Sequence, residues 1–354
     1  MNRDSKQRVV GALGLAAGLA LAAAGAARRS RRLDLRGKVV VVTGGGRGLG
    51  YAIASEFARR GSRLALCGRD PAEVEGAAEA LRRAGADAFA ARCDASDPDE
   101  VARFFAQTLD RFGALDVLVN NAGECFVGPA VALHQADVER ALRNIFWATY
   151  HPTMAALPHL RARRRGRIVN VTSIGGKVGL PHMSAYAAGK FAVTGFSETL
   201  AAELVKDGIY VSTVTPPPLR NGAQLASRYG GRREQEFAWF AWGLSSRLTA
   251  IDARRAARAV VDAAEYGDPE RAVSLSSWLL ARLQGLLPGT TTRVLALVDR
   301  AMPQPPALPA GPWLPGAEVQ AQSDEPALKA LAQTAQAHAA QYRPLGVETR
   351  GLSR

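Results

Sequence analysis

The sequence is poor in the residues that build disulfide frameworks and metal sites. Its 354 residues include three cysteines and five histidines. Cys67, Cys93 and Cys125 stand far apart without a C-x-x-C pair, and no H-E-x-x-H or similar ligand spacing occurs among the histidines. These absences argue against a disulfide scaffold or a thiolate metal site, and they predict that the protein binds no metal. A reducing compartment fits this usage of cysteine.

The sequence also lacks the patterns of nucleic-acid-binding proteins. It contains no zinc-finger spacing, no recognisable helix-turn-helix and no basic motif interleaved with aromatic residues. The formal net charge of +13 nevertheless suits an anionic partner, which besides nucleic acid includes a membrane surface or a phosphorylated cofactor. We therefore expect no nucleic-acid partner and favour the other two.

One uncharged apolar run occupies residues 9–27. As a helix it would be about 28 Å long, close to the hydrocarbon thickness of a bilayer. The run consists mostly of alanine and glycine, which insert weakly, and small residues before Arg28 also suit a signal-peptide cleavage region. A membrane anchor, a signal peptide and a soluble helix are therefore all open interpretations, of which we favour the anchor.

From Lys38 onward, short β-branched runs alternate with longer amphipathic stretches, a pattern typical of βαβ units around a parallel sheet. The sequence predicts an α/β fold of the Rossmann type, with a doubly wound parallel sheet of about seven strands, an N-terminal hydrophobic helix and a C-terminal helical extension. Strands are expected near 38–42, 63–67, 87–92, 116–120, 167–172, 209–214 and 271–275. Helices are expected over 49–60, 72–84, 98–112, 136–160, 185–206 and 252–266.

A glycine-rich turn, Thr43-Gly44-Gly45-Gly46-Arg47-Gly48-Leu49-Gly50, follows the first predicted strand and opens the first helix. Glycines there allow a tight turn and a close approach of the backbone to a pyrophosphate, while the helix N-terminal amides face the anion. We expect the turn to bind a dinucleotide. A flexible turn without a ligand is the alternative.

Two arginines bear on the choice of dinucleotide. Arg47 lies in the glycine-rich turn, and Arg69 directly follows the second strand. Sites that prefer NAD place an acidic residue near the ribose, whereas arginine accommodates a 2′-phosphate. The sequence therefore favours NADP(H) over NAD(H). Solvation of one or both arginines remains the alternative, because Asp70 stands beside Arg69.

A tyrosine and a lysine share one face of a predicted helix, at Tyr186 and Lys190. A free phenol titrates near 10, and a nearby ammonium favours its phenolate, which suits a tyrosine for acid/base chemistry. Ser173 follows the fifth strand, at the carboxyl edge where open α/β sheets bind ligands. Its hydroxyl is suited to bond a substrate oxygen as charge develops there.

With Asp94, Asn120-Asn121-Ala122-Gly123 and Asn144, these motifs resemble the short-chain dehydrogenase/reductase family, in its branch with TGxxxGxG and YxxxK, from about Leu35 to Ser274. The resemblance implies that Tyr186 is the general acid/base and that Lys190 orients the ribose and lowers the pKa of Tyr186. It implies further that Ser173 polarises the carbonyl and that Asn144 supports a proton-relay water. It implies that Asp94 contacts the adenine amine and that a homo-oligomer forms. The expected cofactor-binding residues are Thr43, Gly44, Arg47, Gly48, Leu49, Gly50, Arg69, Asp94, Asn121, Ala122, Gly123, Tyr186, Lys190, Pro216 and Asn221.

One segment departs from the family pattern. After the sixth strand the family usually has Pro-Gly with a threonine soon after, whereas this chain reads Pro216-Pro217-Pro218-Leu219-Arg220-Asn221. Proline lacks the backbone donor that glycine would supply. We expect Asn221 to take the place of the threonine at the nicotinamide carboxamide.

The segments beyond this point bear on the substrate. Four bulky aromatics, Phe237, Trp239, Phe240 and Trp242, stand where the family builds its substrate lid. They suit an apolar wall for a hydrophobic carbonyl or alcohol substrate; packing in the core is the alternative.

Beyond the seventh strand, two apolar helical stretches separated by Pro288 and Gly289 are expected to pack on the domain or lie in a membrane interface. A Pro-rich link and a helix from about Glu325 to Tyr342 follow, and we expect this tail to be peripheral. The predicted divisions are a hydrophobic anchor and basic flank over 1–34, an NAD(P)-binding reductase domain over 35–275, an apolar helical extension over 276–302, and a link with a helical tail over 303–354.

The sequence thus predicts an NADP(H)-dependent ketoreductase or alcohol dehydrogenase that uses Asn144, Ser173, Tyr186 and Lys190. It is expected to associate with a membrane through residues 9–27, with the catalytic domain on the cytoplasmic side, where the cell's dinucleotides are. A catalytically silent NADP(H)-binding scaffold and a membrane-surface interaction protein are the alternatives.

Overall fold

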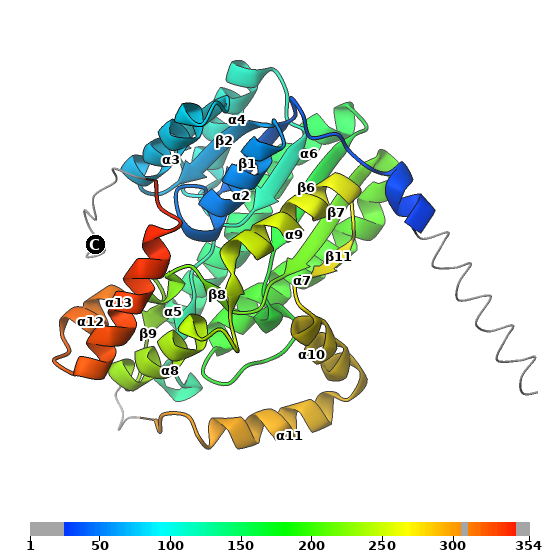
Figure 1. The fold of residues 1–354 in the computed structure, drawn as a ribbon. Helices are drawn as coiled ribbons and strands as arrows, with labels where there is room; N and C mark the ends of the chain where they lie inside the picture. The colour runs from blue at the N-terminus through cyan, green and yellow to red at the C-terminus, as the bar shows by residue number, and fades with distance from the viewer. Residues whose placement is uncertain (1–24, 306–310, 345–354) are drawn as a thin grey trace, which may run out of the picture.

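The computed structural model describes residues 25–305 and 311–344, and its centre is one parallel sheet of seven strands (Figure 1). The strand order is β11-β7-β6-β4-β1-β2-β3, with the change of direction beside β1. The predicted Rossmann-type fold is confirmed, and all seven strands form at the expected places, although the last ends three residues early. They are β1 (Val39–Thr43), β2 (Arg63–Gly68), β3 (Ala88–Arg92), β4 (Val117–Asn120), β6 (Gly166–Val171), β7 (Ile209–Thr215) and β11 (Glu270–Ala272).

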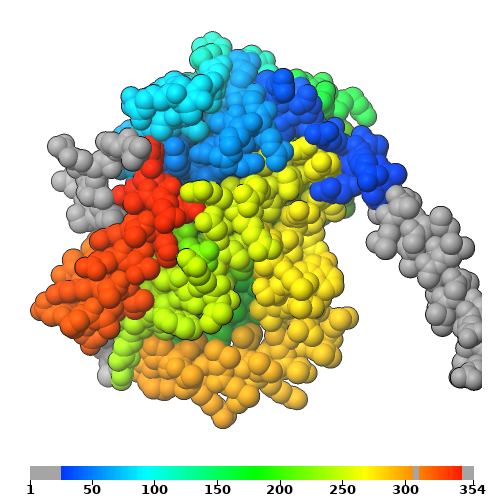
Figure 2. Space-filling view, viewed as in Figure 1, coloured from blue at the N-terminus to red at the C-terminus, as the bar shows by residue number. Residues whose placement is uncertain are grey.

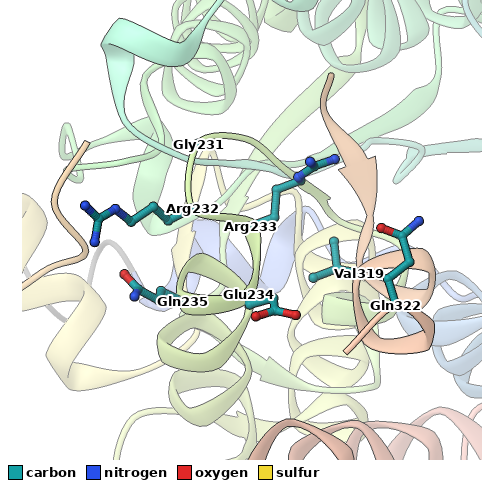
Figure 3. Close-up of a pocket in the computed structure, with 7 residues that line it drawn as sticks. All are labelled: Gly231, Arg232, Arg233, Glu234, Gln235, Val319 and Gln322. Carbon is teal, nitrogen blue, oxygen red and sulfur yellow. The ribbon is translucent and has the colours of Figure 1, made fainter. Parts of the chain in front are cut away.

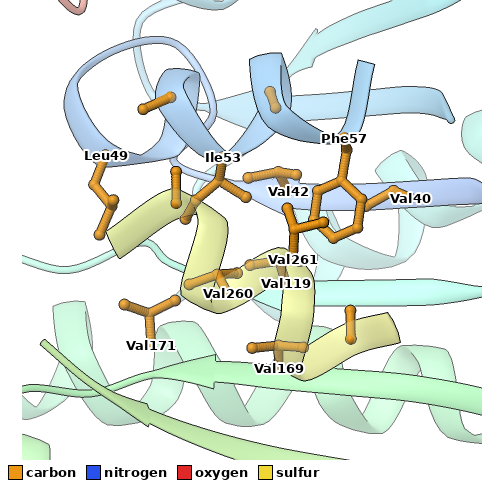
Figure 4. Close-up of a cluster of buried hydrophobic side chains, with 14 of the residues drawn as sticks. Val40, Val42, Leu49, Ile53, Phe57, Val119, Val169, Val171, Val260 and Val261 are labelled. Carbon is orange, nitrogen blue, oxygen red and sulfur yellow. The ribbon is translucent and has the colours of Figure 1, made fainter. Parts of the chain in front are cut away.

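Helices cover both faces of the sheet. One face carries α2 (Gly48–Arg59), α3 (Pro71–Arg83) and α9 (Ala253–Tyr266), and the other carries α4 (Pro98–Phe112), α6 (Ala148–Ala162) and α7 (Ser184–Leu204). The valine run of β1 shows why the strand must lie in the middle. Val40 and Val42 face the α2 and α9 side, drawn in Figure 4, while Val39 and Val41 face the other. A strand buried on both faces is continuously apolar.

The prediction of one continuous helix over 136–160 is wrong, because a π turn interrupts the helix. The structure has α5 (Gln135–Leu142), then a five-residue π turn, Arg143–Trp147, and then α6. Inserted π turns re-aim the side chains around them and are frequent at functional sites. Asn144 lies in this turn, and the amphipathic pattern of the sequence gives no signal of the extra residue.

A smaller layer covers the carboxyl edge of the sheet. It contains α8 (Arg233–Ser245), α12 (Gly316–Ala321) and α13 (Pro326–Ala340). Two minor sheets tie it together: β5 (Phe126–Val127), β9 (Arg228–Tyr229) and β12 (Leu314–Pro315) form one, and β8 (Leu219–Arg220) with β10 (Ile251–Asp252) forms the other.

The expectation of a peripheral tail is wrong for the described residues 311–344. Leu328, Ala332 and Ala335 on α13 are buried in one cluster with the aromatic side of α8. Tyr342 is 3% exposed and belongs to the main core between the sheet and α2. Figure 2 shows the tail, in red, packed against the main body. The apolar residues spaced along one side of α13 explain why the tail is buried.

The proposed division of the chain into domains stays a prediction.

Two helices extend the fold beyond the sheet, α10 (Leu275–Leu286) and α11 (Pro288–Asp299), and they break where Pro288 was expected to break them. Their apolar side chains are largely exposed: Leu275, Trp278, Leu279, Leu283, Leu286, Leu287, Val294, Leu297 and Val298. Within the described parts of the chain, no helix combines the length and the apolarity needed to cross a bilayer. The predicted anchor over 9–27 lies largely outside those residues.

Candidate active site

A cleft of about 940 Å³ opens at the carboxyl ends of the strands. It is lined by every predicted site residue except Thr43. Thr43 is buried beneath the cleft, and its Oγ1 accepts hydrogen bonds from the backbone amides of Asn121, at 3.0 Å, and Ala122, at 3.1 Å. Thr43 therefore joins the glycine-rich turn to the segment after β4.

The glycine-rich turn is too tight for side chains at two positions. Gly44 has a φ of +63°, which favours glycine. A Cβ built on Gly50 would overlap the carbonyl oxygen of Gly44. The Asn121 side-chain amide donates to the carbonyl of Thr43 at 3.1 Å. The residues present thus fit a dinucleotide, since the backbone is bare at the start of α2, where a pyrophosphate would lie.

Two arginines and two carboxylates stand at the end of β2, where the adenosine ribose of a dinucleotide binds. Asp70 is the acidic residue beside Arg69 that left the preference for NADP(H) open. Its side chain accepts hydrogen bonds from the amides of Ala72 and Glu73 and so caps α3. Arg69 is exposed at the rim. Arg47 pairs with Glu73 at 3.2 Å. Glu73 was not among the predicted site residues.

Ser173, Tyr186 and Lys190 meet at the far end of the cleft, beyond the carboxyl end of β6. Ser173 Oγ accepts a hydrogen bond from the amide of Gly175, and its hydrogen bond with Tyr186 favours the phenolate. Burial nevertheless raises the pKa of Tyr186 above its ordinary value. That direction is opposite to the lowering expected from Lys190.

Lys190 is buried and its Nζ donates to the carbonyl of Val171 at 3.0 Å. The ammonium lies 5.9 Å from the centre of the Tyr186 ring. Burial lowers the pKa of Lys190 to about 8, because the charged form is poorly solvated there. The carbonyl of Val171 thus fixes the ammonium in the cleft, near the phenol ring but with its hydrogen bond to the backbone.

Asn144, expected to support a water, donates its side-chain amide to Glu124 at 2.6 Å. Glu124 also accepts from Arg140 at 3.2 Å and from Arg228 at 3.0 Å. Burial opposes the charged form of Glu124, but the two guanidiniums and Asn144 outweigh it, so the pKa of this carboxyl falls below its ordinary value. The sequence signal for Glu124 was its place directly after the Asn-Asn-Ala-Gly segment, at the carboxyl end of a strand.

The sequence of residues 38–228, more than half of the chain, matches the family model of the short chain dehydrogenases. The chain belongs to the short-chain dehydrogenase family. It is an oxidoreductase acting on CH–OH or C=O groups. It is 33% identical over 261 residues to the putative oxidoreductase SadH of Mycobacterium tuberculosis, and the aligned region covers 71% of this chain and 92% of SadH. It is 38% identical over 193 residues to an 11-beta-hydroxysteroid dehydrogenase-like protein of Arabidopsis thaliana, covering 53% and 63%.

Solved structures of the family superpose on the chain. A metagenomic short-chain oxidoreductase in complex with NADP has a TM-score of 0.55 at 30% identity and covers 66% of this chain and 93% of that one. A short-chain dehydrogenase from Burkholderia phymatum in complex with NAD has a TM-score of 0.65 at 23% identity, covering 73% and 96%, and shows the fold alone.

The proline-rich departure of this short-chain dehydrogenase is accommodated within its fold. Pro216 and Pro217 are buried, and the carbonyl of Pro216 accepts a hydrogen bond from the amide of Ile174 at 3.0 Å. Asn221 Oδ1 accepts from the amide of Ala223, the first residue of the short turn that follows. The role of Asn221 at the carboxamide stays a prediction.

The expected aromatic wall of the short-chain dehydrogenase is divided among three environments. Phe240 lines the cleft, whereas Phe237 is fully buried in the core. Trp239 donates its ring N–H to Glu236 at 2.7 Å, and Trp242 points outward with 58% of its surface exposed. Aliphatic side chains complete the apolar end of the cleft: Leu180, Met183, Leu225 and Leu244.

A second hollow, of about 350 Å³, lies at the start of α8 (Figure 3). It is lined by Gly231, Arg232, Arg233, Glu234, Gln235, Val319 and Gln322. None of these is a predicted site residue, and the hollow is separate from the residues that carry the family motifs.

Proposed function

We propose that this short-chain dehydrogenase transfers a hydride between NADP(H) and the carbonyl or hydroxyl group of a hydrophobic substrate. The observation that carries the proposal is that one cleft holds Ser173, Tyr186 and Lys190 at one end and Arg47 and Arg69 at the other. A dinucleotide is long enough to join the two ends.

The catalytic side chains have distinct tasks in carbonyl reduction. The nicotinamide, when bound, supplies the hydride that forms the new C–H bond. Tyr186 donates its phenolic proton to the carbonyl oxygen, and its raised pKa keeps that proton available at neutral pH. The Ser173 hydroxyl is placed to donate a hydrogen bond to the same oxygen as negative charge develops. Lys190 supplies positive charge beside the phenolate left behind.

The choice of NADP(H) is supported by charge. Arg47 and Arg69 border the ribose end. Asp70 also lines the cleft there, but its Oδ1 accepts the amides of Ala72 and Glu73 at the start of α3, which engages part of its negative charge. Guanidinium groups bind phosphate through charge-assisted hydrogen bonds. The solved relatives include one structure with NADP and one with NAD.

A hydrophobic substrate is supported by the apolar end of the cleft, where Met183, Leu225 and Phe240 lie close to Tyr186. Apolar walls with a few polar groups are typical of sites for small apolar ligands. The similarity to hydroxysteroid dehydrogenase-like proteins agrees with this substrate class.

We propose further that the enzyme works at a membrane surface on the cytoplasmic side and forms a homo-oligomer. The exposed apolar faces of α10 and α11, together with the uncharged run at 9–27, support the first proposal. The second is supported by exposed apolar side chains on α6, α7 and the π turn, including Trp147, Met154 and Phe191.

Reductase activity is tested by NADPH oxidation at 340 nm with a panel of hydrophobic ketones, using the full chain and Tyr186→Phe. Turnover is expected in the wild type and is expected to fall by at least about 100-fold in the variant, since the proton donor is gone, while NADPH binding is retained. Tight NADPH binding without turnover on any ketone would favour the silent scaffold. Lipid binding without cofactor affinity would favour the interaction protein.

A further inference from the structure

The end of the described chain closes on the glycine-rich turn. We name residues 326–344, comprising α13 and the four residues after it, the C-terminal clasp. The carbonyl of Tyr342 accepts a hydrogen bond from the amide of Gly48, the first residue of α2, at 2.9 Å. The Tyr342 hydroxyl donates to Asp252 at 2.9 Å, and its ring is buried. Tyr342 therefore fixes the clasp at the start of α2, beside the cofactor cleft that Arg343 and Ala339 line. Figure 1 shows α13, in red, near α2.

The next residue brings a charge into the cleft. Arg343 lines it, and its side chain is only 18% exposed. One guanidinium nitrogen lies 3.7 Å from one carboxylate oxygen of Glu73, and Arg47 Nε lies 3.2 Å from the other. A single carboxylate thus bridges two guanidiniums from opposite ends of the sequence.

This arrangement has the chemistry of an anion site. The side chains of Arg343 and Glu73 are both partly buried, so the cost of removing their charges from water offsets much of the attraction between them. The bridge alone therefore does not explain why a mostly buried arginine faces the cofactor cleft. The carboxylate of Glu73 puts anionic oxygens between the two arginines, beside the end of β2 where the adenosine ribose binds. A phosphate monoester offers more oxygens and more charge to the same guanidiniums.

We propose that the C-terminal clasp completes a phosphate subsite, in which Arg343 joins Arg47 and Arg69 around the 2′-phosphate of NADP(H). Glu73 occupies Arg47 and Arg343 while the cofactor is absent, and the phosphate displaces it from them. The subsite rests on the proposed preference for NADP(H). It assigns part of that preference to a segment that lies outside the residues matched by the family model.

The test measures the dissociation constants of NADPH and NADH by calorimetry on the full chain, for wild type and Arg343→Gln. The matched control is Arg293→Gln, which removes an exposed arginine from α11. Arg343→Gln is expected to weaken NADPH binding about tenfold, the effect of losing one charge-assisted contact. NADH binding is expected to be unchanged, and the control should bind both as the wild type does.

Glu73→Gln gives a second arm with the opposite sign. It removes the carboxylate that competes with the phosphate, so NADPH binding is expected to tighten while NADH binding stays the same. Thermal unfolding of each variant reports whether the clasp remains packed.

The outcomes separate the two proposals. If wild type binds NADH as tightly as NADPH, the proposed cofactor preference is wrong. If wild type prefers NADPH but Arg343→Gln weakens both dinucleotides equally, or neither, the clasp has no phosphate subsite and the preference stands on Arg47 and Arg69. Weaker NADPH binding by Glu73→Gln would also overturn the role given to Glu73.

Discussion

Glu124 balances two positive charges beside the catalytic residues. It pairs with Arg140 and Arg228 and accepts the amide of Asn144, while its own side chain is 9% exposed. Removing one partner of a buried charge network leaves the others uncompensated. Glu124 therefore connects the π turn that carries Asn144 to β9, which carries Arg228.

We expect Glu124→Gln to lower the free energy of unfolding by about 2 kcal/mol at pH 7, because hydrogen bonds to a charged group are lost. The pKa of Glu124 is lowered in the folded state, so its stabilisation is present above the ordinary pKa of glutamate and is lost as the pH falls through the lowered value. Urea unfolding at pH 7 and at acid pH should therefore show the difference between wild type and variant shrinking with acidity. A difference independent of pH would contradict this account.

Lys190 gives the rate of carbonyl reduction its own pH dependence. Its pKa is lowered to about 8, so the ammonium is charged below that pH and neutral above it, while the raised pKa of Tyr186 keeps the phenol protonated throughout. The kcat/KM for reduction is expected to be level below about pH 8 and to fall above it. Residual turnover in Lys190→Arg should lack this fall, because arginine stays charged; a fall at the same pH in that variant would assign it to another group.

At the scale of elements, α13 is as much a part of the core as the helices of the sheet domain. Leu328 on α13 is buried against the apolar side of α8. We expect Leu328→Ala to lower the free energy of unfolding by about 2–4 kcal/mol, the usual cost of a cavity at a buried leucine. Chemical denaturation measures this, and Thr334→Ala, at an exposed position of the same helix, is expected to change little. Equal effects of the two variants would mean that α13 does not pack on α8 in solution.

The elements that the sequence predicted well are those whose signals are local. The β-branched run of β1 and the glycine-rich turn after it lie within 12 residues, and strand and turn chemistry act at that range. The residues of the family motifs could be predicted as a set because the motifs together resemble the short-chain dehydrogenase family. Asn144 was found, but its hydrogen bond to Glu124 was not, because that contact depends on how the π turn orients α5.

The parts that escaped prediction depend on contacts between distant segments. Nothing near Arg343 in the sequence indicates that it reaches Glu73, and nothing near Tyr342 indicates the amide of Gly48. Alternating aromatic and small residues along α8 likewise did not reveal which aromatic side chain would face the cleft. Such contacts are decided by tertiary packing, which local propensity does not encode.

At the scale of the whole molecule, more than half of the large apolar side chains that are exposed among the described residues lie on α10, on α11 or at Leu287 between them. Leu283 on α10 and Leu297 on α11 are both about half exposed, and cationic Arg293 and Arg300 lie nearby in the sequence. Apolar side chains with flanking cations favour an anionic lipid surface.

We expect the double variant Leu283→Asp, Leu297→Asp of the full chain to co-sediment less with vesicles containing phosphatidylserine, because charge opposes insertion of the apolar face. The exposed pair Thr290→Asp, Thr292→Asp serves as a charge-matched control on α11 and should weaken binding less. If the leucine variant binds vesicles as the wild type does, membrane association does not use α10 and α11.

The backbone hydrogen bond between Gly48 and Tyr342 joins residues that are synthesised at very different times. Translation delivers Tyr342 roughly 290 residues after Gly48, a delay of about 15–60 s at ordinary elongation rates. During that interval the nascent sheet and its glycine-rich turn emerge from the ribosome without the segment that later covers them. The turn therefore stays uncovered on the growing chain until α13 is made, and the contact between Tyr342 and Gly48 is among the last to form.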